Sequence, residues 1–536
     1  MENHFLIIET KKKYEDRLQR RFHVMDREVL GQVVSYCAIL KKRQIYVPYF
    51  AIANDKQIAI FRTPENVDKI VDWKAIERRD YGRVLSYDKI AKIREEYLFG
   101  HTRIRFTEDF FFWILKTLVE VYKEEHKFEE LRQPLRYSVI EDLRGFVEVL
   151  SEYILDSIAS YDSKGKKLIF KKDEIMKKLK ELEEKGYTPT PEQLAREMSY
   201  VFMNKIIFYK VLERFYDIEK LEAGYEMGLT SKEKYLNYLY NLFDVVSKKF
   251  KSIFKSGIYD LIDFPDDPEV LKLIDWLIDY IEIFRVERLT DIIGYIYQDL
   301  IPAEERHILG QFYTPQPIAE LITKWCIRSS DDVVMDTGCG SGTFTIEAYK
   351  RLVEKKFGRK FRPEKDYIKK EIHENILNQI YSIDIIEFPC HLTSINLAML
   401  NPRVPSENMN IIQADFFFIE PREYNWSEID PDKSGKIELD KVTTVVGNPP
   451  YTRWTEIPAL DESKNVKERS TRWFIENKLS DLMQNYELTP VVSRGMEPGI
   501  YIYWIMHATS FLRDGGRLGM IISDSWFASR LWYKLW

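Results

Sequence analysis

Short apolar runs alternate with helical segments from about residue 305 onward. Apolar runs of about four to eight residues, bounded by turn-forming residues, are typical of buried strands. Helix-length segments between such strands favour an open, mainly parallel sheet. The sequence therefore predicts an α/β, doubly wound, Rossmann-like sheet, with residues 452–499 as an elaborated loop. The expected strands are Val333–Met335, Ile380–Ile383, Asn410–Gln413, Val442–Val446 and Leu518–Ile522.

The first hundred residues show a pattern of short strands instead. Apolar stretches cover Phe5–Glu9, Gln44–Ala53 and Gln57–Pro64, and the dipeptide Asn54-Asp55 favours a turn between the last two. This pattern predicts a small α/β domain over residues 1–100.

The middle of the chain, residues 101–304, is mostly helical in its hydrophobic period and predicts a helical connector domain. Its charge runs, such as residues 164–185, are typical of a solvated helix face. Thr190 and Pro191 suit the N-cap and first turn of a helix. The third expected domain is then residues 305–536.

Composition narrows the class of protein. The chain has 536 residues, of which 45% are hydrophobic and 31% charged, as in globular proteins. It has no stretch of 18 uncharged apolar residues and no secretory signal, so we expect no membrane span. Its four cysteines form no CxxC pair, which disfavours a disulfide scaffold or zinc ribbon and suits the cytoplasm.

The charge distribution leaves the question of nucleic acid open. The net charge is −6, but residues 1–100 hold 20 basic against 15 acidic residues, and the remainder holds 60 against 71. A DNA partner is compatible with this distribution and is not required by it.

A glycine-rich turn directly follows the first strand of the predicted sheet and opens a helix. Asp336 ends the strand, and Gly338, Gly340 and Gly342 follow in a GxGxG spacing. Glycines let the chain turn sharply and bring backbone N–H groups close to a ligand. The spacing is not the GxGxxG of dinucleotide binders, and no GK[ST] follows, which disfavours an ATP phosphate cradle.

The next two strands also end in acids. Asp384 closes the second strand, where a carboxylate can accept both ribose hydroxyls of a nucleoside. Asp415 follows the third strand, near the expected adenine amino group, and Phe416 could lie near the adenine face. Three consecutive strand ends with suitable groups indicate a nucleoside-containing cofactor.

These residues together resemble S-adenosylmethionine-dependent methyltransferases, and over residues 301–530 N6-adenine DNA methyltransferases of the γ motif order. That group includes type I methylation subunits and type IIG restriction enzymes. Gly310–Pro315 is similar to the family motif that contacts the methionine end of the cofactor, which implies roles for Phe312, Tyr313 and Thr314. Thr314 and Pro315 would also suit an N-cap and first helical position.

The fourth strand ends in Asn448-Pro449-Pro450-Tyr451, at the sheet edge where ligands bind. An exocyclic amino nitrogen is a poor nucleophile because its lone pair is delocalised. The Asn448 side-chain oxygen and the Pro449 carbonyl can accept its N–H bonds and favour a tetrahedral nitrogen. Tyr451 would stack on the flipped base.

Two other functions stay open. Similar signatures occur in methyltransferases that act on RNA or on glutamine amides of proteins. A catalytically incomplete subunit that binds cofactor or DNA as part of an assembly is the non-enzyme alternative. The resemblance favours DNA adenine as the substrate, within a restriction–modification system.

The first hundred residues resemble the PD-(D/E)xK nuclease fold. The resemblance implies that Glu9 ligates Mg²⁺, that Lys11 positions or activates water, and that Gln32 and Tyr36 support the site. Only Met1–His4 precede the strand where the family has its other metal-binding acid. We therefore expect an incomplete nuclease remnant, with Mg²⁺ bound only if another polypeptide completes it.

The C-terminal end of the sequence also leads us to expect an incomplete chain. The chain stops at Trp536, about one helix after Ile522, whereas the family continues into a hairpin and a target-recognition domain. The expected partners are double-stranded DNA and a protein partner or downstream polypeptide that carries target recognition, with no membrane.

Overall fold

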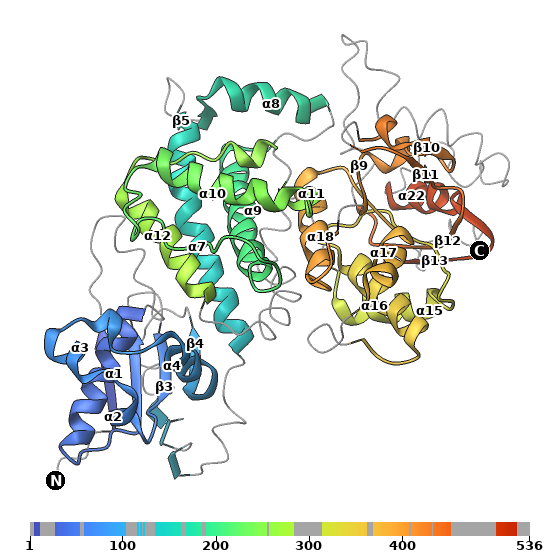
Figure 1. Ribbon diagram of the computed structural model, residues 1–536. Coiled ribbons are helices and arrows are strands. Elements are labelled where there is room, and N and C mark those ends of the chain that lie inside the picture. Colours follow the sequence, from blue (N-terminus) through green and yellow to red (C-terminus); the bar gives the residue numbers. More distant parts are fainter. Residues whose placement is uncertain are drawn as a thin grey trace.

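The computed structural model describes most of the chain, in separate stretches. These are residues 5–10, 27–53, 58–102, 115–116, 118–119, 122–123, 135–161, 168–184, 189–254, 257–282, 314–361, 368–406, 409–430, 433–451 and 500–522. The N-terminal, helical and C-terminal regions follow one another in space as they do in the sequence (Figure 1). Among the described residues, no helix is both long and apolar enough to cross a bilayer.

The C-terminal region is built on a five-stranded parallel sheet in the order β13-β12-β7-β8-β9. Its helices lie before, between and after these strands, as expected for an α/β fold. The strands are β7 (Val334–Asp336), β8 (Ile380–Asp384), β9 (Asn410–Gln413), β12 (Val442–Gly447) and β13 (Leu512–Met520). The helices are α15 (Gln316–Cys326), α16 (Thr343–Phe357), α17 (Lys370–Asn378), α18 (Glu387–Met399) and α22 (Ile500–Thr509).

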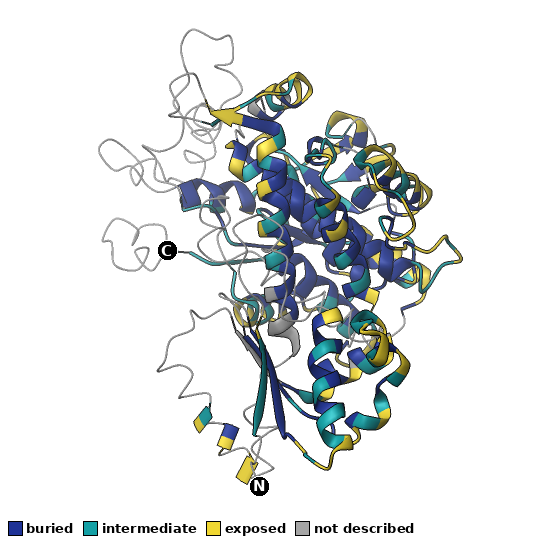
Figure 2. Ribbon diagram, turned by 90° about the vertical axis from the view of Figure 1, so that its left-hand side faces the viewer, coloured by how far each residue is buried: buried dark blue, intermediate teal, exposed yellow. Residues whose placement is uncertain are grey.

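Alternate residues of the strands face two separate hydrophobic layers. Val334 and Val446 belong to the layer that contains α16 and α18, whereas their neighbours Met335 and Val445 belong to the layer that contains α22. Buried residues continue from the first layer through the helical region (Figure 2). The predicted parallel sheet with helices on both faces is therefore confirmed.

The fifth strand begins earlier than expected, at Leu512 rather than Leu518. The segment from Leu512 to Leu518 contains Gly515, with φ +75°, and the register of β13 against β12 shifts in this segment. Charged residues and glycines hide this bulged half of the strand from a search for apolar runs. At Gly519, an added Cβ would lie 2.5 Å from Ile322 Cγ2 and 2.6 Å from Cys326 Sγ, so α15 packs closely on β13.

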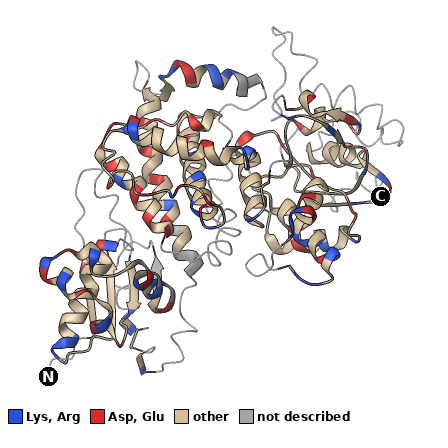
Figure 3. Cartoon of the chain, in the orientation of Figure 1, with Lys and Arg blue, Asp and Glu red and all other residues tan. Residues whose placement is uncertain are grey.

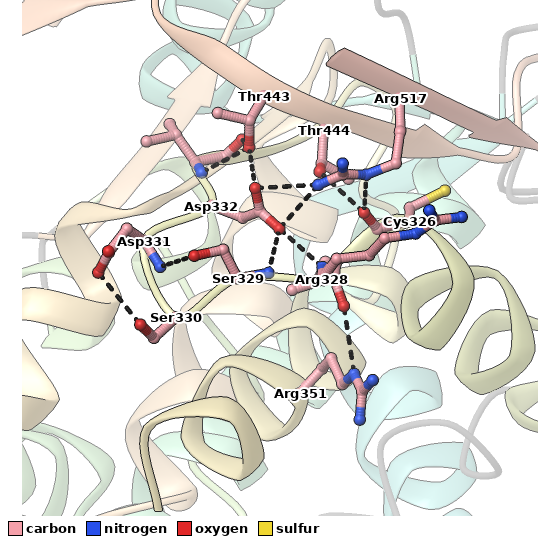
Figure 4. Close-up of polar contacts among 12 residues, drawn as sticks. Cys326, Arg328, Ser329, Ser330, Asp331, Asp332, Arg351, Thr443, Thr444 and Arg517 are labelled. Carbon is pink, nitrogen blue, oxygen red and sulfur yellow. Dashed lines mark hydrogen bonds and ion pairs between the residues drawn. The ribbon is translucent and has the colours of Figure 1, made fainter. Parts of the chain in front are cut away.

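A polar cluster joins the amino ends of three neighbouring strands (Figure 4). The Asp332 carboxylate accepts hydrogen bonds from the backbone N–H groups of Arg328 and Ser329, at 2.7 and 2.8 Å, and from Thr443 Oγ1 at 2.9 Å. Arg517 of β13 pairs with both carboxylate oxygens, at 3.1 and 2.9 Å. Burial alone would raise the pKa of Asp332, but these hydrogen bonds and the arginine lower it. The cluster lies at the end of the sheet opposite to the candidate site.

The edge strand β9 is covered in part by its own chain. A two-stranded hairpin of β10 (Glu423–Asn425) and β11 (Lys436–Glu438) lies after it. Lys433 Nζ donates to the carbonyl oxygens of Met409 and Ile411, at 2.9 and 3.1 Å. A lysine on edge carbonyls protects the strand from pairing with another chain.

The described residues of the middle of the chain are mostly helical. Its helices are α7 (Leu135–Ile158), α8 (Asp173–Glu184), α9 (Pro191–Leu212), α10 (Lys232–Ser247), α11 (Lys251–Phe254) and α12 (Pro268–Glu282), with one hairpin of β5 (Ala159–Tyr161) and β6 (Leu168–Phe170). Thr190 caps α9 through a reciprocal bond with Gln193, as expected. Helix α8 carries its mixed charges on exposed positions (Figure 3).

Helix α18 joins the helical region to the sheet (Figure 1). The Phe388 ring is fully buried and lies 6.1 Å from the ring centroid of Tyr200 and 6.0 Å from that of Tyr259. A Cβ on Gly257 would lie 2.7 Å from Glu387 Oε1, so the backbone approaches α18 closely there. The two regions therefore share a continuous hydrophobic core.

The N-terminal region contains a four-stranded sheet in sequence order. The strands are β1 (Leu6–Thr10), β2 (Tyr49–Ala53), β3 (Ile58–Arg62) and β4 (Leu98–Thr102), with α1 (Arg27–Lys42), α2 (Val67–Ile70), α3 (Trp73–Arg78) and α4 (Tyr87–Lys92) around them. β1 is parallel to β2, and the other pairs are antiparallel. The expected turn at Asn54-Asp55 lies outside the described residues.

Candidate active site

The glycine-rich turn joins β7 to α16. Gly340 and Gly342 have φ values of +52° and +87°, which L side chains rarely adopt. Helix α18 holds the turn, because Thr393 Oγ1 donates to the Gly340 carbonyl at 3.0 Å and Asn396 Nδ2 donates to the Ser341 carbonyl at 2.7 Å. The turn is therefore a fixed loop at the carboxyl end of the first strand.

Asp384 lies beside this turn, at the end of β8. Its Oδ2 accepts from the Gly340 backbone N–H at 3.0 Å, and its Oδ1 accepts from the Ile386 N–H at 3.0 Å. Burial raises the pKa of Asp384 to about 6, against the opposing effect of these N–H groups. Each carboxylate oxygen can accept a further hydrogen bond, so the loop contact and the expected ribose contact are compatible.

Asp336 ends β7 and is almost fully buried. Thr345 Oγ1 donates to its Oδ2 at 2.9 Å and lies 2.8 Å from Ser382 Oγ. Burial raises the pKa of Asp336 to about 7, and the neighbouring charge of Asp384 adds to this effect. The buried Asp336 and the half-buried Asp384 thus lie close to the glycine turn, and a positive charge near them would favour their ionised forms.

The third strand end differs from the expectation for Phe416. Asp415 Oδ1 accepts from the Phe417 backbone N–H at 3.0 Å and so caps a short helical turn. The Phe416 side chain is 1% exposed and packs 4.9 Å from Trp504 and 4.8 Å from His507, between ring centroids. Its ring therefore belongs to the hydrophobic layer that contains α22.

Asn448 lies directly after β12, the neighbour of β7 in the sheet. Its backbone carbonyl oxygen would lie 3.8 Å from a Cβ added to Gly338, so the two motifs are in close proximity. Strand order reverses between β7 and β12, and ligands bind at such a switch point in doubly wound folds. Pro449 is buried, and Pro450 and Tyr451 are half-buried.

The Asn448 side chain contacts two other candidate residues. Its Nδ2 donates to Thr314 Oγ1 at 3.2 Å, and its Oδ1 accepts from the Tyr451 hydroxyl at 2.9 Å. The same hydroxyl lies 2.9 Å from the carbonyl oxygen of Ile521, just beyond β13. The structure thus brings Thr314 together with Asn448 and Tyr451, from two separate parts of the chain.

Two aromatic residues of α22 belong to the site and were not predicted from the sequence. Trp504 Nε1 donates to Thr337 Oγ1 at 2.9 Å, directly after Asp336. The Tyr501 ring centroid lies 6.1 Å from that of Tyr451. The signal available in the sequence was the aromatic helix Ile500–Thr509, immediately before the fifth strand.

The remaining candidate residues are described only in part. Phe312, Tyr313 and Lys11 lie outside the described residues. Gln32 Nε2 donates to the Tyr36 hydroxyl at 2.7 Å on α1, and Glu9 lies in β1, which packs against that helix. In the part of the chain that the structure describes, no group of three or more His, Cys, Asp or Glu side chains could hold a metal ion.

Residues 288–530 match the model of the N-6 DNA Methylase family. The chain therefore resembles N-6 DNA methylases over a little less than half of its length. This similarity supports S-adenosylmethionine as the cofactor. The matched range includes the glycine turn and the Asn448-Pro449-Pro450-Tyr451 motif.

Two curated relatives are methylase subunits of type I restriction enzymes. The MpnII methylase subunit of Mycoplasma pneumoniae is 26% identical over 221 residues, which is 40% of this chain and 36% of the relative. The MjaVIII methylase subunit of Methanocaldococcus jannaschii is 28% identical over 171 residues, 30% of this chain and 27% of the relative. The chain therefore covers about a third of the length of these relatives.

Two solved structures are also similar. The type IIG restriction endonuclease BpuSI has a TM-score of 0.39 and 16% identity, over 97% of this chain and 46% of that one. A type I methyltransferase subunit from Streptococcus thermophilus has a TM-score of 0.36 and 15% identity, over 71% and 74%.

Proposed function

We propose that this protein methylates N6 of adenine in double-stranded DNA as part of a restriction–modification system, with S-adenosylmethionine as the methyl donor. One observation carries the proposal. The Asn448 amide and the glycine turn come from neighbouring strands and lie at the same edge of the sheet. A base amino group held by Asn448 would then face a cofactor held by the glycine turn.

The residues around the turn fit a cationic nucleoside cofactor. Gly338, Gly340 and Gly342 leave space for close backbone approach, and the raised pKa values of Asp336 and Asp384 indicate carboxyl groups that a positive charge would stabilise when ionised. S-adenosylmethionine would supply an activated methyl group at this place. We assign Asp384 to the ribose and Asp415 to the adenine edge. Phe312 and Tyr313 are candidates for the methionine end, and Phe416 supports the adenine side from the core. Thr314, which the resemblance also assigns to the methionine end, has its hydroxyl bonded to Asn448 instead.

The target base would be held by the motif after β12. Asn448 Oδ1 and the Pro449 carbonyl would accept the two N–H bonds of the adenine amino group and so localise its lone pair. Tyr451 would stack on the base once it has left the duplex, with Pro450 fixing the backbone between them. Positioning and charge stabilisation supply most of the catalysis in this mechanism.

Transfer of labelled methyl from S-adenosylmethionine tests the proposal. Purified protein is incubated in parallel with unmethylated DNA, RNA and total protein, with and without the product of the next gene downstream. N6-methyladenine in DNA is expected, and Asn448→Ala should abolish it while cofactor affinity stays within a few fold. If only RNA or protein is labelled, the substrate is RNA or protein and not DNA. Cofactor binding without any transfer would favour a catalytically incomplete assembly subunit.

We also propose that residues 1–100 are a remnant of a PD-(D/E)xK nuclease, with residues 101–304 as connector and residues 305–536 as methyltransferase. The parallel pairing of β1 with β2 and the contact between Gln32 and Tyr36 support this ancestry. Glu9 and Lys11 would be the remaining catalytic pair, and Mg²⁺ would bind only with ligands from another polypeptide. If this chain alone makes specific double-strand breaks in DNA with Mg²⁺, the proposal that residues 1–100 are only a remnant is wrong.

A further inference from the structure

We infer that Thr314 is a positioning residue for the target-base site, and that its hydroxyl fixes the Asn448 amide. The inference rests on the proposed function, because it assigns Thr314 a part in methyl transfer rather than in helix capping or cofactor affinity. Thr314 precedes α15, and Asn448 follows β12, more than a hundred residues later.

The hydroxyl does not cap the helix that follows it. Pro315 is the N-cap of α15, and it makes no side-chain cap hydrogen bond. Thr314 Oγ1 instead accepts a hydrogen bond from Asn448 Nδ2 at 3.2 Å. The side chain therefore points into the site and away from its own helix.

The oxygen of the Asn448 amide accepts a hydrogen bond from a hydroxyl that has a second acceptor within reach. The Tyr451 hydroxyl lies 2.9 Å from Asn448 Oδ1 and 2.9 Å from the Ile521 carbonyl oxygen. A tyrosine hydroxyl has one hydrogen, so it donates to one of these oxygens at a time. When it donates to Ile521, a lone pair of Oδ1 becomes available for a substrate amino group.

Thr314 keeps the amide in place during this exchange. The terminal torsion of asparagine has a broad energy profile, so the amide plane needs a fixed partner to hold a defined direction. With Nδ2 held by Thr314, Oδ1 stays directed to the side of Tyr451, where the base would stack. Loss of the hydroxyl should therefore reduce the rate of transfer more than it reduces binding.

The test compares Thr314→Val, which removes the hydroxyl at nearly constant volume, with Thr314→Ser, which keeps it. We expect Thr314→Val to lower the single-turnover rate of DNA methylation about ten- to a hundredfold, as misplacement of a reacting group does. The Kd for S-adenosylmethionine should stay within about twofold, since the hydroxyl contacts Asn448. Thr314→Ser should restore most of the rate.

Thr323→Val is the matched control, because the Thr323 hydroxyl bonds only within α15, to the carbonyl oxygens of Ala319 and Glu320. It should leave the transfer rate unchanged. An unchanged rate for Thr314→Val would overturn the inference. So would a weaker cofactor Kd with a normal rate at saturation, which would make Thr314 a cofactor contact.

A second measurement does not depend on activity. In urea unfolding, Thr314→Val should lower the midpoint in the wild-type background and have no effect in the Asn448→Ala background, because the partner is then absent. If the effects of Thr314→Val and Asn448→Ala on the urea midpoint are additive, the two side chains do not interact and the inference fails. If the contact is present and the wild-type protein transfers no methyl to any substrate, the proposed function fails and the positioning role fails with it.

Discussion

At the scale of single residues, burial raises the pKa values of the two acids next to the glycine turn, Asp336 and Asp384. Asp336 and Asp384 have raised pKa values because their carboxyl groups are removed from water. Hydrogen bonds from Thr345 and from backbone N–H groups compensate only in part. The native protein without cofactor therefore binds protons more tightly at these groups than the unfolded chain does.

The first prediction concerns the stability of the cofactor-free protein as a function of pH. The pKa of Asp336 is raised from 3.8 to about 7, so its contribution to the free energy of unfolding is fully present below pH 4 and is lost as the pH rises through 7. Asp336→Asn cannot ionise. From pH 5 to 8, it should gain stability relative to wild type by about 1–4 kcal/mol, measured by urea unfolding.

The exposed Asp244 provides the control, since Asp244→Asn removes the same charge from a surface position. Its stability relative to wild type should change little over this range. A difference between Asp336→Asn and wild type that is constant from pH 5 to 8 would contradict the assignment. Saturating S-adenosylmethionine should reduce the pH dependence, because a cation favours the ionised carboxylate.

At the scale of elements, packing of α15 on β13 brings Thr314 and Ile521 to the same site. Gly519 permits this approach, because its missing side chain leaves room for Ile322 and Cys326. Gly519→Ala should therefore destabilise the protein by about 1–3 kcal/mol through overpacking, measured by urea unfolding. Gly82→Ala is the control, since its Cβ would meet only Asp80 Oδ1, at 3.9 Å. Equal stability of both variants would refute the close packing.

The pattern of elements was largely predictable from the sequence, and the contacts between them were not. The strands β7, β8, β9 and β12 are visible as apolar runs within one residue of their bounds. The early start of β13 was missed because its first half is polar and bulged. The bond between Thr314 and Asn448 depends on tertiary packing, and local propensity had favoured an N-cap at Thr314 instead.

The position of a candidate residue was predictable where a strand end fixes it, as for Asp384 and Asn448. It was not predictable for Phe416, because a sequence shows that an aromatic follows a strand but not which face it takes. Trp504 and Tyr501 were missed for the related reason that a helix apolar on all sides gives no periodic signal.

At the scale of the whole molecule, the helical region and the C-terminal parallel sheet share one core through α18. Phe388 is fully buried between Tyr200 and Tyr259, which belong to the helical region. The connector is therefore part of the fold that supports the site. Since α18 also holds the glycine turn through Thr393 and Asn396, a disturbance at this interface should reach the cofactor loop.

Phe388→Ala tests this coupling. Removal of a buried phenylalanine leaves a cavity and should cost about 3–5 kcal/mol in the free energy of unfolding. Because one cooperative core spans both regions, we expect a single calorimetric transition at a lower temperature, together with weaker S-adenosylmethionine binding. Phe357→Ala is the matched control, since Phe357 is 44% exposed at the end of α16 and should change both quantities little. If Phe388→Ala splits the transition in two and leaves cofactor affinity intact, the helical region is a separate module and does not support the site.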